Sequence, residues 1–82
     1  MKLKLMLIRN GISNKTGNPY TIITVRGKRT DGSSVSNDFF ISESVKNQLV
    51  GIQEDDYIQL EFDLNENLYP SVVGIYKDEA DA

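Results

Sequence analysis

Polar and apolar residues alternate along several short segments of the chain, a pattern typical of β-strands with one covered face. The alternation is clearest at residues 57–64, where apolar side chains are separated by charged or amide ones. Residues 20–26 are dense in β-branched and aromatic side chains, which favour strands. Residues 2–8, 35–41 and 69–76 have the same character. The sequence therefore predicts five strands.

Turn-forming residues separate the predicted strands. Residues 10–11 and 14–19 are rich in Asn, Gly and Pro, which set the backbone angles of turns. Asp31-Gly32 is a strong signal for a tight β-hairpin. Residues 53–56 and 65–67 supply the remaining turns. Each predicted strand is therefore short and bounded.

One segment, residues 42–51, has the features of a short helix of about two turns. Ser42 is a suitable N-cap, and Glu43 lies near the positive end of the helix dipole. Lys46 follows later in the segment, and Gly51 stands at the position that often ends a helix.

The order of elements is strand, strand, strand, short helix, strand, strand. This is the order of the OB-fold, a partly open five-stranded barrel that often binds oligonucleotides. An SH3-like barrel, which also has five short strands, is the structural alternative. We expect an all-β fold: one OB-fold domain over residues 1–77, followed by a short acidic tail at residues 78–82.

The residue inventory argues against catalysis. The chain contains no cysteine and no histidine, so the commonest metal ligands and the commonest general base are missing. No Gly-rich phosphate loop precedes a helix. The carboxylates at 54–56, and at Glu61 and Asp63, are expected to be solvated rather than to bind a cation. We therefore expect no enzyme activity, no cofactor and no metal.

The first residues, MKLKLMLI, superficially resemble a signal peptide. Lys4 interrupts the apolar run, Arg9 ends it, and no small-residue cleavage site follows. No segment reaches the roughly 18 apolar residues of a membrane span. The absence of cysteine is compatible with a reducing cytoplasm, and we expect a cytoplasmic protein with no membrane association.

Charge is unevenly distributed along the sequence. Residues 1–37 hold seven cations and one carboxylate, a net charge of +6. Residues 38–82 hold two cations and eleven carboxylates, a net charge of −9. Such asymmetry indicates an anionic partner for one surface of the molecule.

The loop at residues 10–20 combines a cation with an aromatic side chain. Lys15, together with Arg9, could contact phosphates while Tyr20 stacks on a base, the combination that single-stranded nucleic acid requires. The alternative is an ordinary hairpin in which Gly17 and Pro19 shape the turn and Tyr20 packs at the start of a strand.

Two further groups could extend such a surface. Phe39 and Phe40 are neighbours in a strand and must face opposite sides, and we assign Phe39 to the core and Phe40 to the surface. Arg26, Lys28 and Arg29 flank the Asp31-Gly32 turn and could contact phosphates, the alternative being a solvated hairpin tip. The tyrosines at 57, 69 and 76 are expected to be structural.

Two motifs resemble those of the single-stranded DNA-binding proteins of filamentous phages, the gene V protein type. They are GISNKTGNPYT at residues 11–21 and FFISESV at residues 39–45. The resemblance implies an OB-fold with a protruding DNA-binding wing. It makes Lys15 a phosphate contact and Tyr20 a base stacker, with Gly17 and Pro19 shaping the loop. It places Phe40 or Phe39 in the DNA channel.

The same resemblance implies a partner and a setting. It implies a homodimer held by the hairpin from Leu64 to Tyr69, which coats single-stranded DNA without sequence preference during replication of a phage or mobile element. The acidic tail is expected to be a solubilising end, the alternative being a mimic of the DNA phosphates that binds a protein partner or inhibits the protein's own DNA binding. The alternative for the whole chain is a small β-barrel module for protein–protein interaction with no role in nucleic-acid binding.

Overall fold

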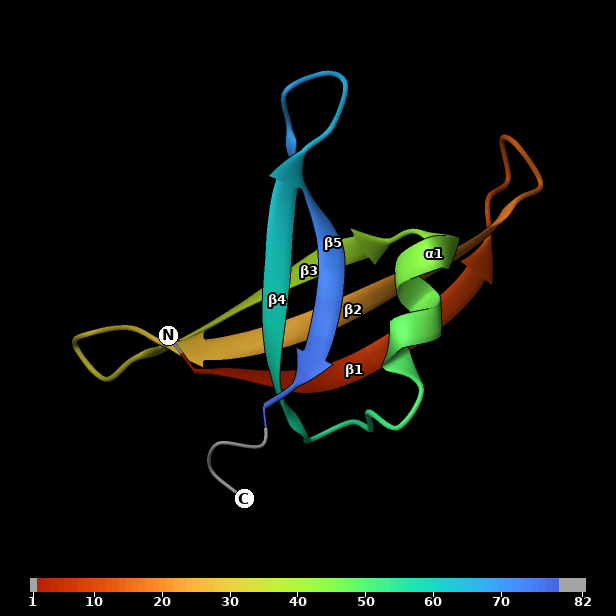
Figure 1. Cartoon of the computed structure of the whole chain (residues 1–82). Coiled ribbons are helices and arrows are strands. Elements are labelled where there is room, and N and C mark those ends of the chain that lie inside the picture. The colour runs from red at the N-terminus through yellow and green to blue at the C-terminus, as the bar shows by residue number, and fades with distance from the viewer. Residues whose placement is uncertain (1, 79–82) are drawn as a thin grey trace.

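Antiparallel strands and one short helical segment make up residues 2–78, the part of the chain that the computed structural model describes (Figure 1). The elements follow the predicted order. They are β1 (Leu3–Ile12), β2 (Pro19–Lys28), β3 (Ser34–Ile41), α1 (Glu43–Lys46), the 3-10 turn η1 (Asn47–Leu49), β4 (Tyr57–Leu64) and β5 (Pro70–Lys77). The prediction of five strands with a short helix between the third and the fourth is confirmed.

The five strands form one sheet in the order β3-β2-β1-β4-β5. Figure 1 shows β1, β2 and β3 running together as one layer, with the β4–β5 hairpin crossing in front of it. β1 and β4 are paired only at one corner, where Leu3 lies opposite Ile58 and Lys4 opposite Tyr57. The sheet therefore bends at this corner into two layers that enclose the core.

The predicted barrel is not closed. β3 and β5 approach each other, but within residues 2–78 they are not hydrogen-bonded neighbours, and they remain the two edges of the sheet. The helical segment contacts β5 near this seam. The side-chain oxygen of Gln48 accepts the backbone N–H of Ile75 at 3.0 Å, so η1 satisfies an edge group of β5 that is not used in pairing with β4.

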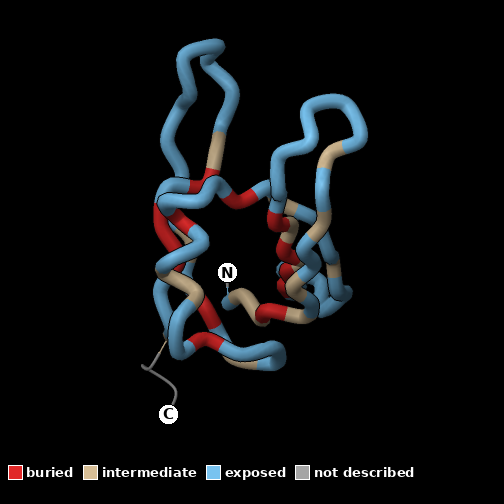
Figure 2. The backbone as a smooth tube through the Cα atoms, turned by 90° about the vertical axis from the view of Figure 1, so that its right-hand side faces the viewer, coloured by how far each residue is buried: buried red, intermediate tan, exposed pale blue. Residues whose placement is uncertain are grey.

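A small aliphatic core fills the space between the two layers. Alternate residues of β2, namely Thr21, Ile23 and Val25, are buried, as the period of a half-covered strand requires. The Thr21 hydroxyl donates to Asn10 Oδ1 at 2.8 Å, so this buried polar group is satisfied. Figure 2 shows the buried positions in the body of the molecule. The other buried apolar residues are Leu5, Ile41, Val45, Ile52, Ile58, Val72 and Ile75.

The helical segment differs in detail from the prediction. It is one short α-helical stretch followed by a 3-10 turn, because Val45 is its only buried residue and so short a helix has little intrinsic stability. Ser42 stands at the N-cap, but its hydroxyl pairs with Ser44 Oγ at 3.0 Å and makes no capping bond. Gly51 has the positive φ of +85° expected of the residue that ends the segment.

The acidic turn at residues 53–56 forms hydrogen bonds with β1. The sequence had suggested only a solvated turn. Leu5 N–H donates to the Asp56 carbonyl at 2.9 Å, and Asp55 N–H donates to the Leu5 carbonyl at 2.6 Å. The Glu54 carboxylate accepts the backbone N–H of Ile8 at 2.9 Å. This turn therefore completes hydrogen bonds along the part of β1 that lies beyond its short pairing with β4.

Candidate nucleic-acid interface

One face of the β1–β2–β3 layer points away from the core, and we refer to it as the outer face. In β2 it carries the residues that alternate with the buried ones. The strand register places a cross-strand neighbour beside each of them. From one end to the other, the rows are Gly11–Tyr20, Arg9–Ile22–Phe40, Leu7–Thr24–Asp38, Lys4–Arg26–Ser36 and Lys28–Ser34.

A β-bulge in β1 brings two cations onto this face. Lys4 and Arg9 are five positions apart, so a regular strand would place them on opposite sides of the sheet. The register shifts between Leu5 and Leu7, and beyond the shift Arg9 lies beside Ile22, on the same face as Arg26. The outer face therefore carries cations from both halves of β1.

An aromatic pair stands at one end of the outer face. The rings of Tyr20 and Phe40 meet edge to face, with their centroids 6.3 Å apart. Phe40 is 73% exposed and Tyr20 is 38% exposed, so both rings present surface to solvent. Phe39 points to the other side and packs edge to face on Phe62, at 5.6 Å between ring centroids. The assignment of Phe39 to the core side and Phe40 to the surface is confirmed.

Gly11 provides room for the Tyr20 ring. It lies directly opposite Tyr20 in the β1–β2 ladder, and a Cβ built on it would collide with the ring and the hydroxyl of Tyr20. The ring therefore lies against the backbone of β1 at this position. Sequence reasoning did not include Gly11 in the site, although a glycine in a strand often marks a close approach of this kind.

Lys15 stands at the tip of the β1–β2 loop, beyond the outer face. Ser13 and Asn18 close the loop through a 2.9 Å backbone bond, and Gly17 has a positive φ of +72°. The Ser13 hydroxyl oxygen accepts the backbone N–H groups of Lys15 and Thr16 at 3.3 and 3.4 Å. The loop is thus internally organised, and it presents the exposed Lys15 to solvent. Its other predicted shaping residue, Pro19, is the first residue of β2.

Arg26, Lys28 and Arg29 lie at the opposite end of β2 from Tyr20. Arg26 donates from Nη2 to Ser34 Oγ at 3.1 Å. Arg29 lies in the β2–β3 turn and donates to Ser33 Oγ at 3.4 Å. The same turn holds Asp31, whose pKa lies below its usual value because Ser33 donates to its carboxylate. Arg26 and Lys28 therefore share the outer face with the aromatic pair, whereas Arg29 belongs to the turn.

A carboxylate stands in the middle of the outer face. Asp38 accepts a hydrogen bond from Thr24 Oγ1 at 2.6 Å and forms an ion pair with Arg9 at 2.9 Å. The Thr24 hydrogen bond, with a further contribution from Arg9, holds the pKa of Asp38 below its usual value. Arg9 is thus a predicted site residue that is already paired with a carboxylate of its own chain.

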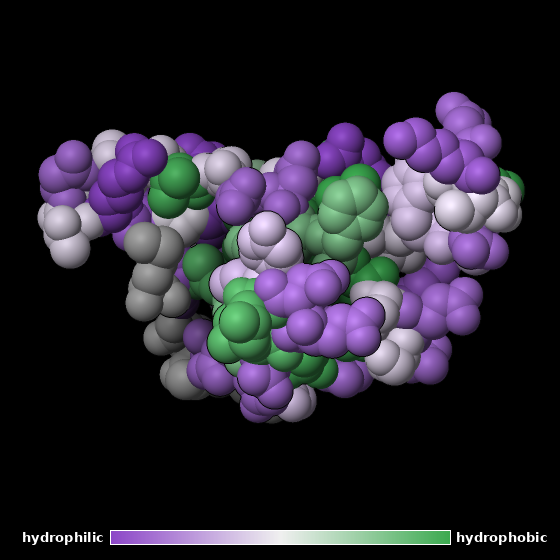
Figure 3. All heavy atoms as spheres, turned by 90° about the horizontal axis from the view of Figure 1, so that it is seen from above, coloured by the Kyte–Doolittle hydropathy of each residue, from purple (hydrophilic) through white to green (hydrophobic). Residues whose placement is uncertain are grey.

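The resemblance to the filamentous-phage proteins assigns the β4–β5 hairpin to dimerisation. This hairpin carries exposed apolar side chains. Leu64, Leu68 and Tyr69 are 57%, 75% and 69% exposed. This hairpin and the β1–β2 loop rise from the same end of the molecule as two exposed arms (Figures 1 and 2). Seen from that end, apolar side chains form separate patches near the middle of the surface, with hydrophilic ones between them and at both ends (Figure 3).

Sequence reasoning found five of the residues on the outer face and missed others. Arg9, Tyr20, Arg26, Lys28 and Phe40 share this face, whereas Lys15 and Arg29 occupy loops at its two ends. The structure adds Gly11, Leu7, Ile22 and Lys4. The alternation of β2 could have indicated Ile22, but Lys4 and Leu7 depend on the bulge, which the sequence pattern did not reveal.

Comparison of the chain with protein-family models, curated proteins and solved structures finds no match to any of the three. Among residues 2–78, no group of three or more acidic, His or Cys side chains is arranged to hold a metal ion. The described residues also include no helix with the length and apolar character needed to cross a membrane. Four of the five residues of the acidic tail, 79–82, lie outside the described part.

Proposed function

We propose that this protein binds single-stranded DNA without strong sequence preference. The observation that carries the proposal is the outer face, where the exposed Tyr20–Phe40 pair shares one surface with Lys4, Arg26 and Lys28. Proteins that bind single strands combine aromatic stacking platforms with a cationic track for the backbone. Both components are present here on three adjacent strands.

In the proposed mechanism the protein performs no reaction and needs no cofactor. Bases stack on Tyr20 and Phe40, which supplies roughly 1–3 kcal/mol per base for any base, because every base has a π-face. Cations of the outer face and Lys15 at the loop tip contact phosphates. Each phosphate contact releases counterions, so affinity falls as the salt concentration rises.

We also propose that the sheet is a variant of the OB-fold. Two features support this: the position of the helix between β3 and β4, and the β4–β5 hairpin that crosses the β1–β2–β3 layer. Ligand binding on the outer side of the second and third strands is typical of that fold. The approach of β3 to β5 is compatible with a barrel that is open along this seam.

The active form in this proposal is a homodimer joined through the β4–β5 hairpin. Leu64, Leu68 and Tyr69 are all exposed on this hairpin, and exposed apolar patches often mark protein interfaces. A domain of 82 residues also gains stability from burial between subunits.

The proposed setting is the coating of single-stranded DNA during replication of a phage or mobile element in the bacterial cytoplasm. It rests on the resemblance of residues 11–21 and 39–45 to the filamentous-phage proteins. A surface that binds by stacking and charge, and does not read base edges, suits this role because it accepts any sequence.

The deciding experiment is a fluorescence-anisotropy titration of labelled poly-dT at low and at physiological salt. We expect tight binding at low salt, marked weakening at physiological salt, and little response to duplex DNA. Absence of binding at low salt would contradict the proposal and favour a protein-interaction module. Labelled poly-rU in the same titration separates a preference for DNA from binding to any single strand.

A further inference from the structure

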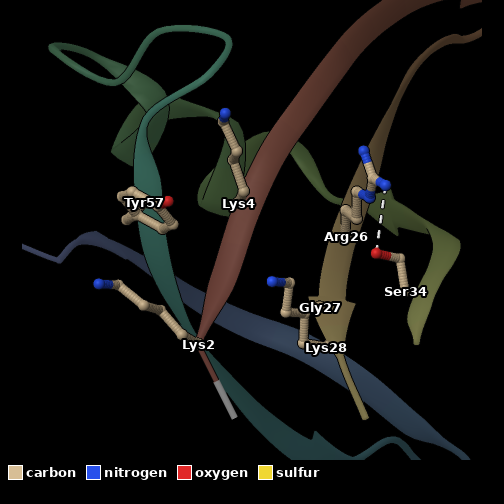
Figure 4. A pocket seen from close by; sticks show the side chains of 7 residues that line it. All are labelled: Lys2, Lys4, Arg26, Gly27, Lys28, Ser34 and Tyr57. Carbon is tan, nitrogen blue, oxygen red and sulfur yellow. Dashed lines mark hydrogen bonds between the residues drawn. The ribbon is translucent and has the colours of Figure 1, made fainter. Parts of the chain in front are cut away.

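A cationic cavity of about 460 Å³ lies at the end of the outer face farthest from the aromatic pair. Figure 4 shows its main side chains: Lys2 just before β1, Lys4 on β1, Arg26 and Lys28 on β2, and Tyr57 on β4. No Asp or Glu is among the residues that line it. Four cationic side chains around one opening make it strongly attractive to anions.

Tyr57 organises two of these cations. The ammonium nitrogens of Lys2 and Lys4 lie 4.4 and 5.9 Å from the centre of its ring, within the range of cation–π attraction. On the other side of the cavity, Ser34 accepts a hydrogen bond from Arg26. The sequence suggested only a structural role for Tyr57, yet this residue is 41% exposed and lines the cavity.

The cavity continues the same surface that carries the aromatic pair. Lys4 lies directly opposite Arg26, and Arg26 follows Tyr20 by six positions on the outer side of β2. At about 3.3 Å per residue the two ends are roughly 20 Å apart. That distance suits one continuous strand, because a site on a fold of this type covers about 4–16 nucleotides.

We propose that this cavity is a second subsite of the interface, which binds backbone phosphates of the strand whose bases stack on Tyr20 and Phe40. The inference rests on the proposed function and adds the path of the nucleic-acid strand over the surface, from the aromatic pair across Arg26 to Lys4. Tyr57 is a positioning residue: its ring holds the ammonium groups of Lys2 and Lys4 on the β4 side of the cavity, and it does not itself contact a base.

The test compares a dT4 strand with a dT12 strand, measured by anisotropy over a range of salt concentrations. The variant Lys4→Gln/Arg26→Gln/Lys28→Gln removes three cations of the cavity. With dT12 we expect the slope of log affinity against log salt to become shallower by about 2, because each lost contact to a single strand removes about 0.7. With dT4 stacked at Tyr20 we expect little change.

Two further variants separate a positioning role from general charge. Tyr57→Phe keeps the ring and should retain the binding of dT12, whereas Tyr57→Leu should weaken it about as much as one lost cation. Lys46→Gln removes a charge from α1, outside the cavity, and should leave the difference between dT12 and dT4 unchanged.

The outcomes distinguish the subsite from the function itself. Failure of the unaltered protein to bind either strand would remove the proposed function. If Tyr20→Ala weakens the binding of both dT4 and dT12 while the triple variant changes the binding of neither, the proposed function stands and the subsite is overturned. Equal weakening of dT4 and dT12 by the triple variant would also overturn it, because the effect would then be one of net charge.

Discussion

The β1–β2 and β4–β5 hairpins have a similar construction and opposite surface chemistry. Each pairs two long antiparallel strands, each contains a register shift, and each extends from the same end of the molecule. Each also places a glycine against a tyrosine: Gly11 against Tyr20, and Gly74 against Tyr76. The surroundings of the two rings differ. Tyr20 meets the exposed ring of Phe40, whereas Tyr76 lies near the Glu61 carboxylate.

The charge on Glu61 has a measurable effect on its own hairpin. It raises the pKa of Tyr76 above its usual value, with a smaller contribution from desolvation. A phosphate approaching Tyr76 would meet that same negative charge, whereas Tyr20 lies on the outer face that carries Arg9, Arg26 and Lys28. Similar backbone frames thus serve different partners: nucleic acid for the β1–β2 side and a second copy of the chain for the β4–β5 side, in the proposed assignment.

The largest expected effect concerns the β4–β5 hairpin. Leu68 has a positive φ of +65°, so Leu68→Asn removes an apolar side chain in favour of a residue that tolerates this backbone. Burial of a leucine contributes about 1.5–3 kcal/mol, and a two-fold interface loses it twice. We expect the protein to be a dimer at micromolar concentration and the variant to be largely monomeric by light scattering. A monomeric unaltered protein would refute the assignment of this hairpin.

The next effect concerns the aromatic pair on the β1–β2 side. Tyr20→Ala should weaken binding of poly-dT by about 1–3 kcal/mol, or roughly 5- to 150-fold, because a stacking platform is lost. Tyr76→Ala is the matched control on the other hairpin and should leave the affinity unchanged. Circular dichroism should show both variants folded. Equal losses for the two variants would remove the distinction between the hairpins.

Gly11→Ala tests the same ring from its neighbour. The added Cβ would meet the Tyr20 ring and displace it while both binding side chains remain present. Affinity for poly-dT should therefore fall, as for Tyr20→Ala, but by a smaller factor. In the double variant Gly11→Ala/Tyr20→Ala, the glycine substitution should have no further effect on binding, because the ring that it displaces is already gone.

The smallest expected effect is a gain in affinity. Asp38→Asn can keep the contact to Thr24 but removes the charge that pairs with Arg9. Affinity for poly-dT should rise a few-fold, and the salt slope should steepen by about 0.7 if Arg9 gains a phosphate. Unfolding stability should change little, since exposed ion pairs contribute about 0–1 kcal/mol. An unchanged affinity would show that Arg9 lies outside the path of the strand.

Protonation of Asp38 removes the same charge as Asp38→Asn does. The unaltered protein should therefore resemble this variant only at a pH low enough to protonate Asp38. The Thr24 hydrogen bond lowers the pKa in the folded state, so the carboxylate is charged at neutral pH and loses its charge only at acid pH. Its contribution to stability is present above the pKa of the unfolded chain and disappears as the pH falls through the lowered value. Between pH 6 and 8, affinity should therefore not respond to this group.

The strands and the exposed aromatic residue could be predicted because they depend on local patterns. The period of β2 places Ile23 inside and Tyr20 outside, and the register of residues 39 and 40 follows from neighbouring positions. The bulge of β1 could not be predicted in the same way. It is accompanied by a hydrogen bond from Ile8 to Glu54, 46 positions away, which no local pattern contains. The hydrogen bond between Ile75 and Gln48, 27 positions apart, is equally absent from any local pattern.

Because of the bulge, the binding surface depends on the number of residues between its cations as well as on the identity of those cations. Lys4 and Arg9 share a face because one extra residue is inserted between them. If β1 kept all its residues but paired without the bulge, every side chain beyond Leu5 would change face. Arg9 would then turn toward the core and Ile8 toward solvent, although no cation had been removed. Among related chains, the spacing between these two cations is therefore a more informative marker of this surface than the overall charge.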